Sequence, residues 1–308
     1  MFKKVKAKLI SYIDQAVDRR IDGTVDRKIE QILPVLAQLV DFHNSPEEKH
    51  QSYYDRTRNL EELKKRFLNN GIPVEEMDID INDFENWLDS FPALQKHYSH
   101  MGDVVIEKCL EHYLTYNRLN IRTEDIFIDI AACGSPWANI LRNSGVKSYR
   151  LDMTYPKGIH GIDIGANAAD TKLPSNFASV LALHCAFQCF MGDSDFLFIR
   201  EANRILKKDG RLGIVPLYCD HTYFVLTSPY YDQQFVHIET GAKRVWRDDK
   251  YQEPFSRYYS PEVFAQRIFS ELGNMKGKLL FVGNLGELLK KYPGQKVYCH
   301  FMFYGQKL

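Results

Sequence analysis

Strand-like and helix-like segments alternate through residues 124–308, and this alternation limits the folds open to the chain more than any other feature. Stretches with helical spacing separate six short apolar runs, Ile126–Ile130, Tyr149–Leu151, Val180–Leu183, Leu212–Val215, Leu279–Val282 and Val297–Tyr304. Such alternation predicts an α/β domain with a mostly parallel sheet covered by helices on both faces. Ligands of these sheets bind beyond the carboxyl ends of the strands.

An apolar stripe with mostly four-residue spacing runs through residues 1–44. It predicts one amphipathic helix, and its heavily charged polar faces favour a coiled coil that makes the protein a homo-oligomer. Packing of the helix on its own domain is the first alternative. Membrane-surface docking is the second, because Lys3, Lys4, Lys6 and Lys8 lie beside apolar residues.

Residues 45–123 read as a helical cap region. Helical patterns cover Leu60–Phe67, Asp83–Tyr98 and Asp103–Tyr116, and the turn-forming residues 69–73 end the first of them. The aromatic residues of this region are expected in the core.

Charge and cysteine content exclude several function classes. The 40 basic and 40 acidic residues balance, so any binding of nucleic acid must come from a local patch, and none is expected. The 6 cysteines form no CxxC pair and no evident disulfide framework, so we expect no metal site. Without a signal-peptide pattern or a membrane-spanning run, a cytoplasmic location is expected, with at most peripheral membrane contact.

The segment Phe127–Trp137, FIDIAACGSPW, follows the first predicted strand and so occupies the position of a nucleotide-binding loop. It lacks the G-x-G-x-x-G pattern of dinucleotide folds and the lysine of a triphosphate-binding loop. The missing glycine pattern therefore argues against a nicotinamide-dependent oxidoreductase. Ser135 is expected to cap the next helix, and Pro136 to open it.

Four blocks of sequence together resemble the class I S-adenosylmethionine-dependent methyltransferases, in the branch that modifies small molecules and glycans. They are FIDIAACGSPWANIL, RLDM, AADTKLPSNFASVLALHCAFQCF and REANRILKKDGRLGIVPLY, and they span about residues 125–217. The resemblance implies a Rossmann-like fold over residues 124–308 and S-adenosylmethionine as the cofactor.

The resemblance also implies which residues would hold that cofactor. Asp152 would accept hydrogen bonds from the ribose hydroxyls, and Asp170 or Asn167 from the adenine amine. Asp129 would orient the loop or meet the ammonium group through a water. The loop backbone at Ala131 and Gly134 would approach the cofactor closely.

The loop departs from the family pattern at its glycine positions. Ala131, Cys133 and Ser135 stand where the family has glycines. A methyl group at Ala131 is tolerated if φ is negative there. If it is not tolerated, the chain is a degenerate, catalytically inactive module for assembly or binding.

Methylation of a hydroxyl group needs a base as well as positioning. His184, at the end of the fourth strand of the domain, is one candidate, and His221, beside Asp220, is the other. For each, a histidine satisfied by a backbone carbonyl is the alternative.

Aromatic and basic residues gather in an insertion at about residues 218–259. Rings cover the C–H faces of sugars, and arginines bind anionic groups, so we expect O-methylation of a sugar, glycan or other small-molecule hydroxyl. An aromatic cap that packs over its own core is the alternative. The candidate substrate-binding residues are Tyr218, Tyr223, Arg244, Trp246 and Arg257.

Overall fold

The central element of the computed structural model is an eight-stranded sheet. The structure describes residues 59–228, 238–247 and 255–308, with isolated positions at 33, 36, 40, 49 and 50. In spatial order the strands are β2 (Val74–Met77), β11 (Met275–Val282), β12 (Phe301–Lys307), β7 (Leu206–Val215), β6 (Ala178–His184), β3 (Ile126–Ile130), β4 (Lys147–His160) and β5 (Asp163–Gly165).

The strand order reverses in the middle of this sheet. From β3 the chain moves outward through β4 to β5, then returns to the other side of β3 for β6 and β7, and these five strands are parallel. β12 runs antiparallel to both β7 and β11. This is a Rossmann-like arrangement, as the sequence predicts, and its topological switch point lies between β3 and β6, where ligands of such sheets bind.

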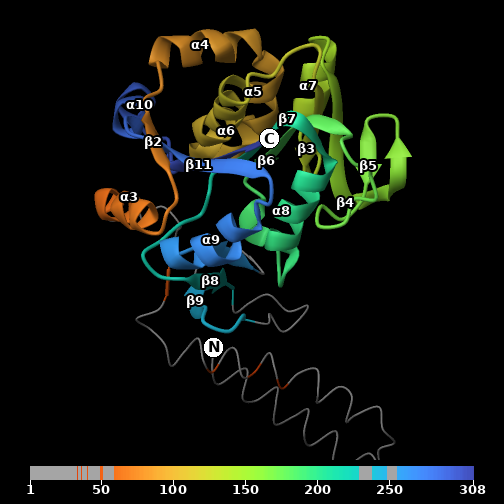
Figure 1. Cartoon of the computed structure of the whole chain (residues 1–308). Helices are drawn as coiled ribbons and strands as arrows, with labels where there is room; N and C mark the ends of the chain where they lie inside the picture. Colours follow the sequence, from red (N-terminus) through yellow and green to blue (C-terminus); the bar gives the residue numbers. More distant parts are fainter. Residues whose placement is uncertain are drawn as a thin grey trace, which may run out of the picture.

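Helices cover both faces of the sheet, so the molecule has three layers (Figure 1). One face packs against α3 (Leu60–Asn69), α8 (Ser194–Ile205) and α9 (Pro261–Arg267). The other packs against α4 (Ile81–Ser90), α5 (Pro92–Tyr98), α6 (Val105–Arg118), α7 (Trp137–Asn143) and α10 (Leu285–Lys291). Three short 3-10 helices complete the main body, η3 (Ser99–Val104), η4 (Phe187–Cys189) and η5 (Phe269–Glu271).

The two apolar layers follow from the alternation of side chains along each strand. In β6, Leu181 and Leu183 belong to the α8 side of the core, whereas Val180 and Ala182 belong to the α6 side. A strand that is buried on both faces has a continuous run of apolar residues in its sequence. This is why the central strands could be located from the sequence.

Some predicted elements differ from the structure. The helix predicted over Asp83–Tyr98 is broken at Phe91, because Pro92 cannot donate the backbone hydrogen bond that a continuous helix needs. β2 was not predicted: it lies in the region expected to be helical and forms the edge strand beside β11. The last predicted strand begins at Phe301 and not at Val297.

The aromatic insertion supplies three strands of a second, four-stranded sheet, and residues 49–50 supply the fourth. Its order is β1 (Lys49–His50), β9 (Lys243–Arg247), β8 (Phe224–Thr227) and β10 (Ser256–Tyr258). Trp246, Tyr218 and Tyr223 are buried. Tyr218 packs in a small cluster with Phe224 and Tyr258, whereas Tyr223 belongs to the core of the main sheet. A sugar-binding surface formed by these rings stays a prediction, and it would require the rings to become exposed.

Arg257 anchors this small sheet to the main domain. Its side chain is fully buried and pairs with Asp195 at 2.7 Å and with Glu239. It also donates to the carbonyl oxygens of Phe190 (2.7 Å) and Gly192 (2.9 Å). Contact of Arg257 with a substrate stays a prediction, and it would require the guanidinium to leave these internal partners.

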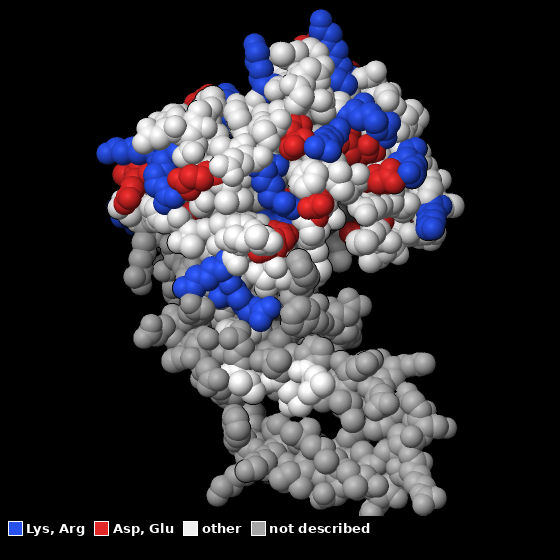
Figure 2. All heavy atoms as spheres, turned by 60° about the horizontal axis from the view of Figure 1, so that its bottom comes forward, with Lys and Arg blue, Asp and Glu red and all other residues white. Residues whose placement is uncertain are grey.

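The predicted N-terminal helix and its coiled coil lie outside the described residues, apart from three isolated helical positions. No helix in the described part of the chain is long and apolar enough to span a membrane. On the face shown in Figure 2, blue and red side chains are interspersed, in keeping with the balanced composition.

Loss of the Arg257 side chain should destabilise the protein strongly. We expect Arg257→Ala to lower the free energy of unfolding by about 3–5 kcal/mol, because Glu239 would lose its ion pair while mostly buried and Asp195 would keep only Arg267 as a cationic partner. The control is Arg200→Ala, which breaks an exposed pair with Glu271 and should cost below about 1 kcal/mol. Urea unfolding followed by circular dichroism measures both, and equal losses would contradict the anchoring role.

Candidate functional site

The loop after β3 adopts a backbone conformation normally reserved for glycine. φ is 54° at Ala131, 41° at Cys133 and 84° at Gly134. The condition of a negative φ at Ala131 is thus not met, and two residues with side chains occupy the left-handed region. Such strain persists only where the surroundings enforce it, and it concentrates at functional sites.

Asp152 and Tyr155, from β4, hold this loop in place. One oxygen of Asp152, Oδ2, accepts a hydrogen bond from the Cys133 N–H at 3.0 Å, and the other, Oδ1, accepts from the N–H and hydroxyl of Thr154. The Gly134 N–H donates to the Tyr155 hydroxyl at 3.1 Å. A carboxylate offers about four acceptor positions, so Oδ2 of Asp152 keeps one for a further donor.

The helix after the loop starts one residue later than predicted. α7 begins at Trp137 with Pro136 as the cap residue, and Ser135 Oγ accepts from the Trp137 N–H at 3.2 Å.

Asp129, the fourth residue of β3, is buried and pairs with His184 at the end of β6. His184 Nδ1 lies 2.9 Å from Asp129 Oδ1, and Nε2 lies 2.9 Å from Thr115 Oγ1 of α6. Both ring nitrogens of His184 therefore have side-chain partners, and neither is satisfied by a backbone carbonyl. In this conformation His184 connects β3, β6 and α6, and a role as base would require Nε2 to leave Thr115.

A second imidazole extends this polar cluster toward α5. The rings of His112 and His184 lie 4.0 Å apart, and His112 Nε2 lies 3.0 Å from the Tyr98 hydroxyl. Burial, together with the neighbouring His184, lowers the pKa of His112 well below its usual value. The imidazole of His112 is therefore neutral near pH 7.

Two buried polar atoms of the cluster lack a partner among the described residues, Asp129 Oδ2 and His112 Nδ1. An unsatisfied buried carboxylate oxygen is costly, so Asp129 Oδ2 fits a hydrogen-bond donor or cation that the protein itself does not supply.

A charged cluster on α6 was not predicted from the sequence. Lys108 Nζ lies 2.6 Å from Glu111 Oε1, and Glu107 Oε2 accepts from the Tyr298 N–H at 3.0 Å. All three side chains are buried. No sequence signal marks this cluster, because Glu107, Lys108 and Glu111 lie on the polar side of an amphipathic helix, which is normally exposed to solvent.

Burial and the nearby Glu111 raise the pKa of Glu107 to about 8. Glu111 also has a raised pKa because of burial. Lys108 stays charged, because its pKa is raised by the surrounding acidic groups despite its burial. Glu107 is therefore largely protonated at neutral pH.

Other predicted site residues lie apart from this cluster. His221 Nδ1 lies 3.3 Å from Arg66 Nη1 of α3, and Asp220 Oδ1 accepts from the Thr222 N–H. Asn167 and Asp170 form a bridge in the loop after β5, where Asp170 also pairs with Lys172 at 2.6 Å. Arg244 stacks over Trp246, with 5.1 Å from its guanidinium carbon to the ring centroid. The candidates His184 and His221 thus bond to different elements.

In the described part of the chain, no group of three or more His, Cys, Asp or Glu side chains is arranged to hold a metal ion.

Comparison with known proteins gives similarity only at the level of structure. No family model and no curated protein matches the chain. A 1,6-didemethyltoxoflavin-N1-methyltransferase from Burkholderia thailandensis, solved with S-adenosylhomocysteine, is 12% identical over 76% of this chain and 93% of its own, with a TM-score of 0.43. An S-adenosylmethionine-dependent methyltransferase from Mesorhizobium loti is 12% identical over 63% of this chain and 97% of its own, with a TM-score of 0.39.

The match to a Pyrococcus horikoshii protein is shorter. It covers 34% of this chain and half the length of that protein, at 12% identity and a TM-score of 0.29. The fold assignment therefore rests on the strand order of the sheet.

The left-handed backbone at Gly134 should make this position intolerant of a side chain. Open space surrounds an added Cβ at both Gly134 and Gly286 of α10, but φ is positive only at Gly134. We expect Gly134→Ala to cost about 1 kcal/mol and Gly286→Ala to stabilise by about 0.4–1 kcal/mol. Thermal and urea unfolding measure the difference, and two effects of the same sign would disprove the loop conformation.

Glu107 should make stability fall as pH rises. Its pKa of about 8 in the folded protein lies above the ordinary glutamate value of 4.5, so the folded state holds a proton that the unfolded state releases between these pH values. We expect Glu107→Gln, which mimics the protonated acid, to gain stability relative to wild type by more than about 1 kcal/mol between pH 5 and pH 8.

Urea unfolding at pH 5, 6.5 and 8 tests this expectation. Glu287→Gln, at an exposed position of α10, serves as the control and should keep a constant difference from wild type. Parallel pH curves for wild type and Glu107→Gln would show that Glu107 is ionised in the folded protein.

Proposed function

We propose that this chain is an S-adenosylmethionine-dependent methyltransferase that acts on a hydroxyl group of a small molecule. The observation that carries the proposal is the β3 loop, where Ala131, Cys133 and Gly134 keep a left-handed backbone at the topological switch point. Retaining this conformation without glycine at two positions is costly, which supports a site in use.

The residues around the loop fit this cofactor chemically. S-adenosylmethionine carries an ammonium group, which suits the unsatisfied Oδ2 of buried Asp129. The remaining acceptor position of Asp152 would receive a ribose hydroxyl, and Asn167 or Asp170 the adenine amine. The cofactor carries no phosphate, which agrees with a loop that lacks a lysine and whose Cys133 and Gly134 N–H groups already donate to Asp152 and Tyr155.

When bound, the cofactor supplies a methyl group on a positively charged sulfur that leaves readily. The protein's own contribution is to position the acceptor and exclude water. Tyr98, which interacts with Ser135 of the β3 loop, would cover the site, and the Asp129–His184 pair would provide its polar floor. His184 would act as base only after releasing Thr115, since both its nitrogens are occupied in this structure.

The acceptor cannot be chosen by the aromatic insertion alone. Tyr218, Tyr223 and Trp246 are buried, and Arg257 is paired with residues inside the protein. In this conformation these side chains therefore do not support a sugar or glycan acceptor. A small-molecule hydroxyl stays as the proposed acceptor because an oriented imidazole lies at the end of β6.

A catalytically inactive module is the second candidate. It is favoured by the same strained loop, because Ala131 and Cys133 carry side chains where close backbone approach is needed. In that case the protein would serve in assembly or binding and would not bind S-adenosylmethionine.

Calorimetric titration of the full chain with S-adenosylmethionine and with S-adenosylhomocysteine separates the two candidates. We expect micromolar binding that Asp129→Asn weakens by at least about tenfold, since a charge-assisted hydrogen bond is worth about 1.5–3 kcal/mol. Glu287→Gln, on the exposed face of α10, is the matched control and should bind like wild type.

The folding of each variant is checked by circular dichroism before titration. If Asp129→Asn unfolds, Asp152→Asn replaces it, because that carboxylate lies at the end of the regular β3–β4 pairing. No heat with either ligand, in a folded wild-type protein, would overturn the methyltransferase proposal and leave the inactive module.

A further inference from the structure

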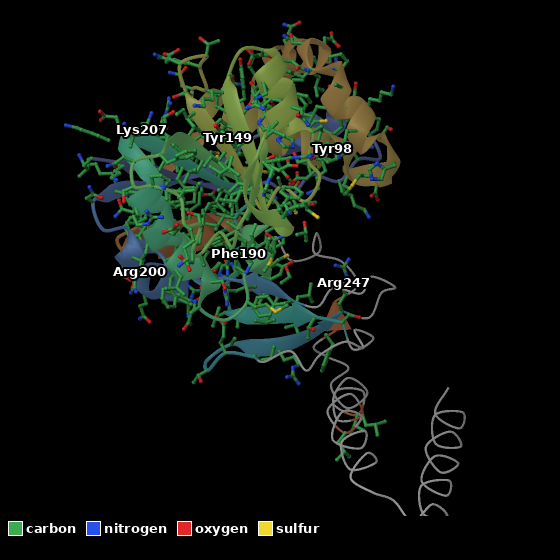
Figure 3. The ribbon with its side chains drawn as sticks, turned by 90° about the vertical axis from the view of Figure 1, so that its right-hand side faces the viewer. Tyr98, Tyr149, Phe190, Arg200, Lys207 and Arg247 are labelled. Atoms are coloured by element: carbon green, nitrogen blue, oxygen red, sulfur yellow. The ribbon has the colours of Figure 1, made fainter. Side chains whose placement is uncertain are left out.

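A positively charged cavity lies at the amino-terminal edge of the main sheet, away from the β3 loop. Its volume is about 490 Å³, and it is formed by the end of α6, the start of β3 and the turn that opens β7. Figure 3 shows Lys207, from this edge, and Tyr98, beside the candidate site, on opposite sides of the molecule. The cationic residues that line it are Arg118, Arg122, Lys207, Lys208 and Arg211.

The positive charge of this cavity is poorly compensated. Only Asp125 and Asp209 are acidic among its lining residues. Asp125 is already used, because Oδ1 accepts from Arg211 at 2.6 Å and Oδ2 from the Arg122 N–H at 2.9 Å. Among residues 59–228, 238–247 and 255–308, no carboxylate forms an ion pair with Arg118, Lys207 or Lys208.

The turn carrying two of these lysines is fixed by its backbone. Residues 207–210 bulge out of the sheet, because β6 pairs with Leu206 and then with Arg211. Asp209 has a φ of 60°, and a Cβ at Gly210 would lie 2.7 Å from the Lys207 carbonyl oxygen. A larger residue at position 210 would therefore open the turn and move both lysines.

Arg211 is held in place at the wall of the cavity. Its guanidinium donates to the Asn120 carbonyl oxygen at 3.1 Å as well as to Asp125. Its Nε is buried and has no partner among the described residues. A fixed guanidinium with an unused donor is suited to an anion, since arginine presents its N–H groups as a planar fork.

We propose that this cavity binds the phosphate groups of a small ligand that carries at least two negative charges. Three features support it: the excess of cationic groups, the fixed turn at residues 207–210, and a volume within the range of small-molecule sites. The ligand differs chemically from S-adenosylmethionine, which has no phosphate. The inference does not rest on the proposed function, and either can fail without the other.

Calorimetric titration of the full chain with pyrophosphate at low and at moderate salt tests the proposal. We expect one binding site per chain, with affinity that falls as salt rises, because the contacts are charged. The double variant Arg122→Ala/Lys208→Ala, both at exposed positions, should weaken binding by about tenfold or more. The control, Lys65→Ala/Lys290→Ala, removes the same charge from exposed helix positions elsewhere and should leave affinity unchanged.

Two further ligands identify the source of the phosphate. Adenosine diphosphate is expected to bind at the same site and to compete with pyrophosphate, whereas a short single-stranded RNA is expected to bind no better than pyrophosphate. Absence of pyrophosphate binding, an equal loss in the control variant, or binding of RNA alone would each overturn the proposal.

Discussion

The buried pair of Asp129 and His184 is the interaction on which the candidate site depends. A carboxylate on the central strand cannot stay buried without partners, because its desolvation costs several kcal/mol. His184, on the neighbouring strand β6, is one such partner of Asp129, and Thr115 of α6 bonds the other nitrogen of the imidazole. Three elements are thus tied together at the carboxyl end of the sheet.

This connection explains why α6 departs from an ordinary amphipathic helix. A helix that brings Thr115 and His112 to the end of the sheet turns its next polar positions, Lys108 and Glu111, into the protein as well. Charges buried in this way must pair or take up protons, and both occur, in the Lys108–Glu111 contact and in the raised pKa of Glu107.

The architecture was predictable from the sequence because both faces of the central strands are buried. β3 was located to the residue, and β4, β6, β7 and β11 contain the apolar runs that predicted them. β2 and β5 escaped notice because each has only three or four residues, too few for a pattern to emerge. The break in the helix at Pro92 was readable in the sequence, since the missing N–H is a property of that residue alone.

The places of the candidate site residues in the fold were predictable from the sequence, but their hydrogen-bond partners were not. Asp129 and His184 lie at or near the carboxyl ends of β3 and β6, and Asp152 directly follows the last residue of β4 that pairs with β3. Thr154, two residues after Asp152, is a local Asx-turn partner, but no spacing rule connects Thr115 and Cys133 to the residues that they contact.

Arg257 is a second example of a residue whose contacts could not be predicted from the sequence. An arginine among aromatic residues suits both a binding surface and a buried anchor, and composition does not distinguish the two. Arg257 is a buried anchor in this structure because Asp195 and Glu239, from other segments of the chain, lie beside it. Only the tertiary structure brings these residues together.

The two edges of the sheet differ in how completely their charges are matched. At the carboxyl edge, Asp129 meets His184, Asp152 meets a backbone N–H and Thr154, and Lys108 meets Glu111. At the amino edge, the cavity holds more cationic groups than its two carboxylates can match. Since the whole chain carries 40 groups of each sign, this excess is a property of the fold and not of the composition. Like charges close together repel and cost stability, and a bound anion would remove that cost.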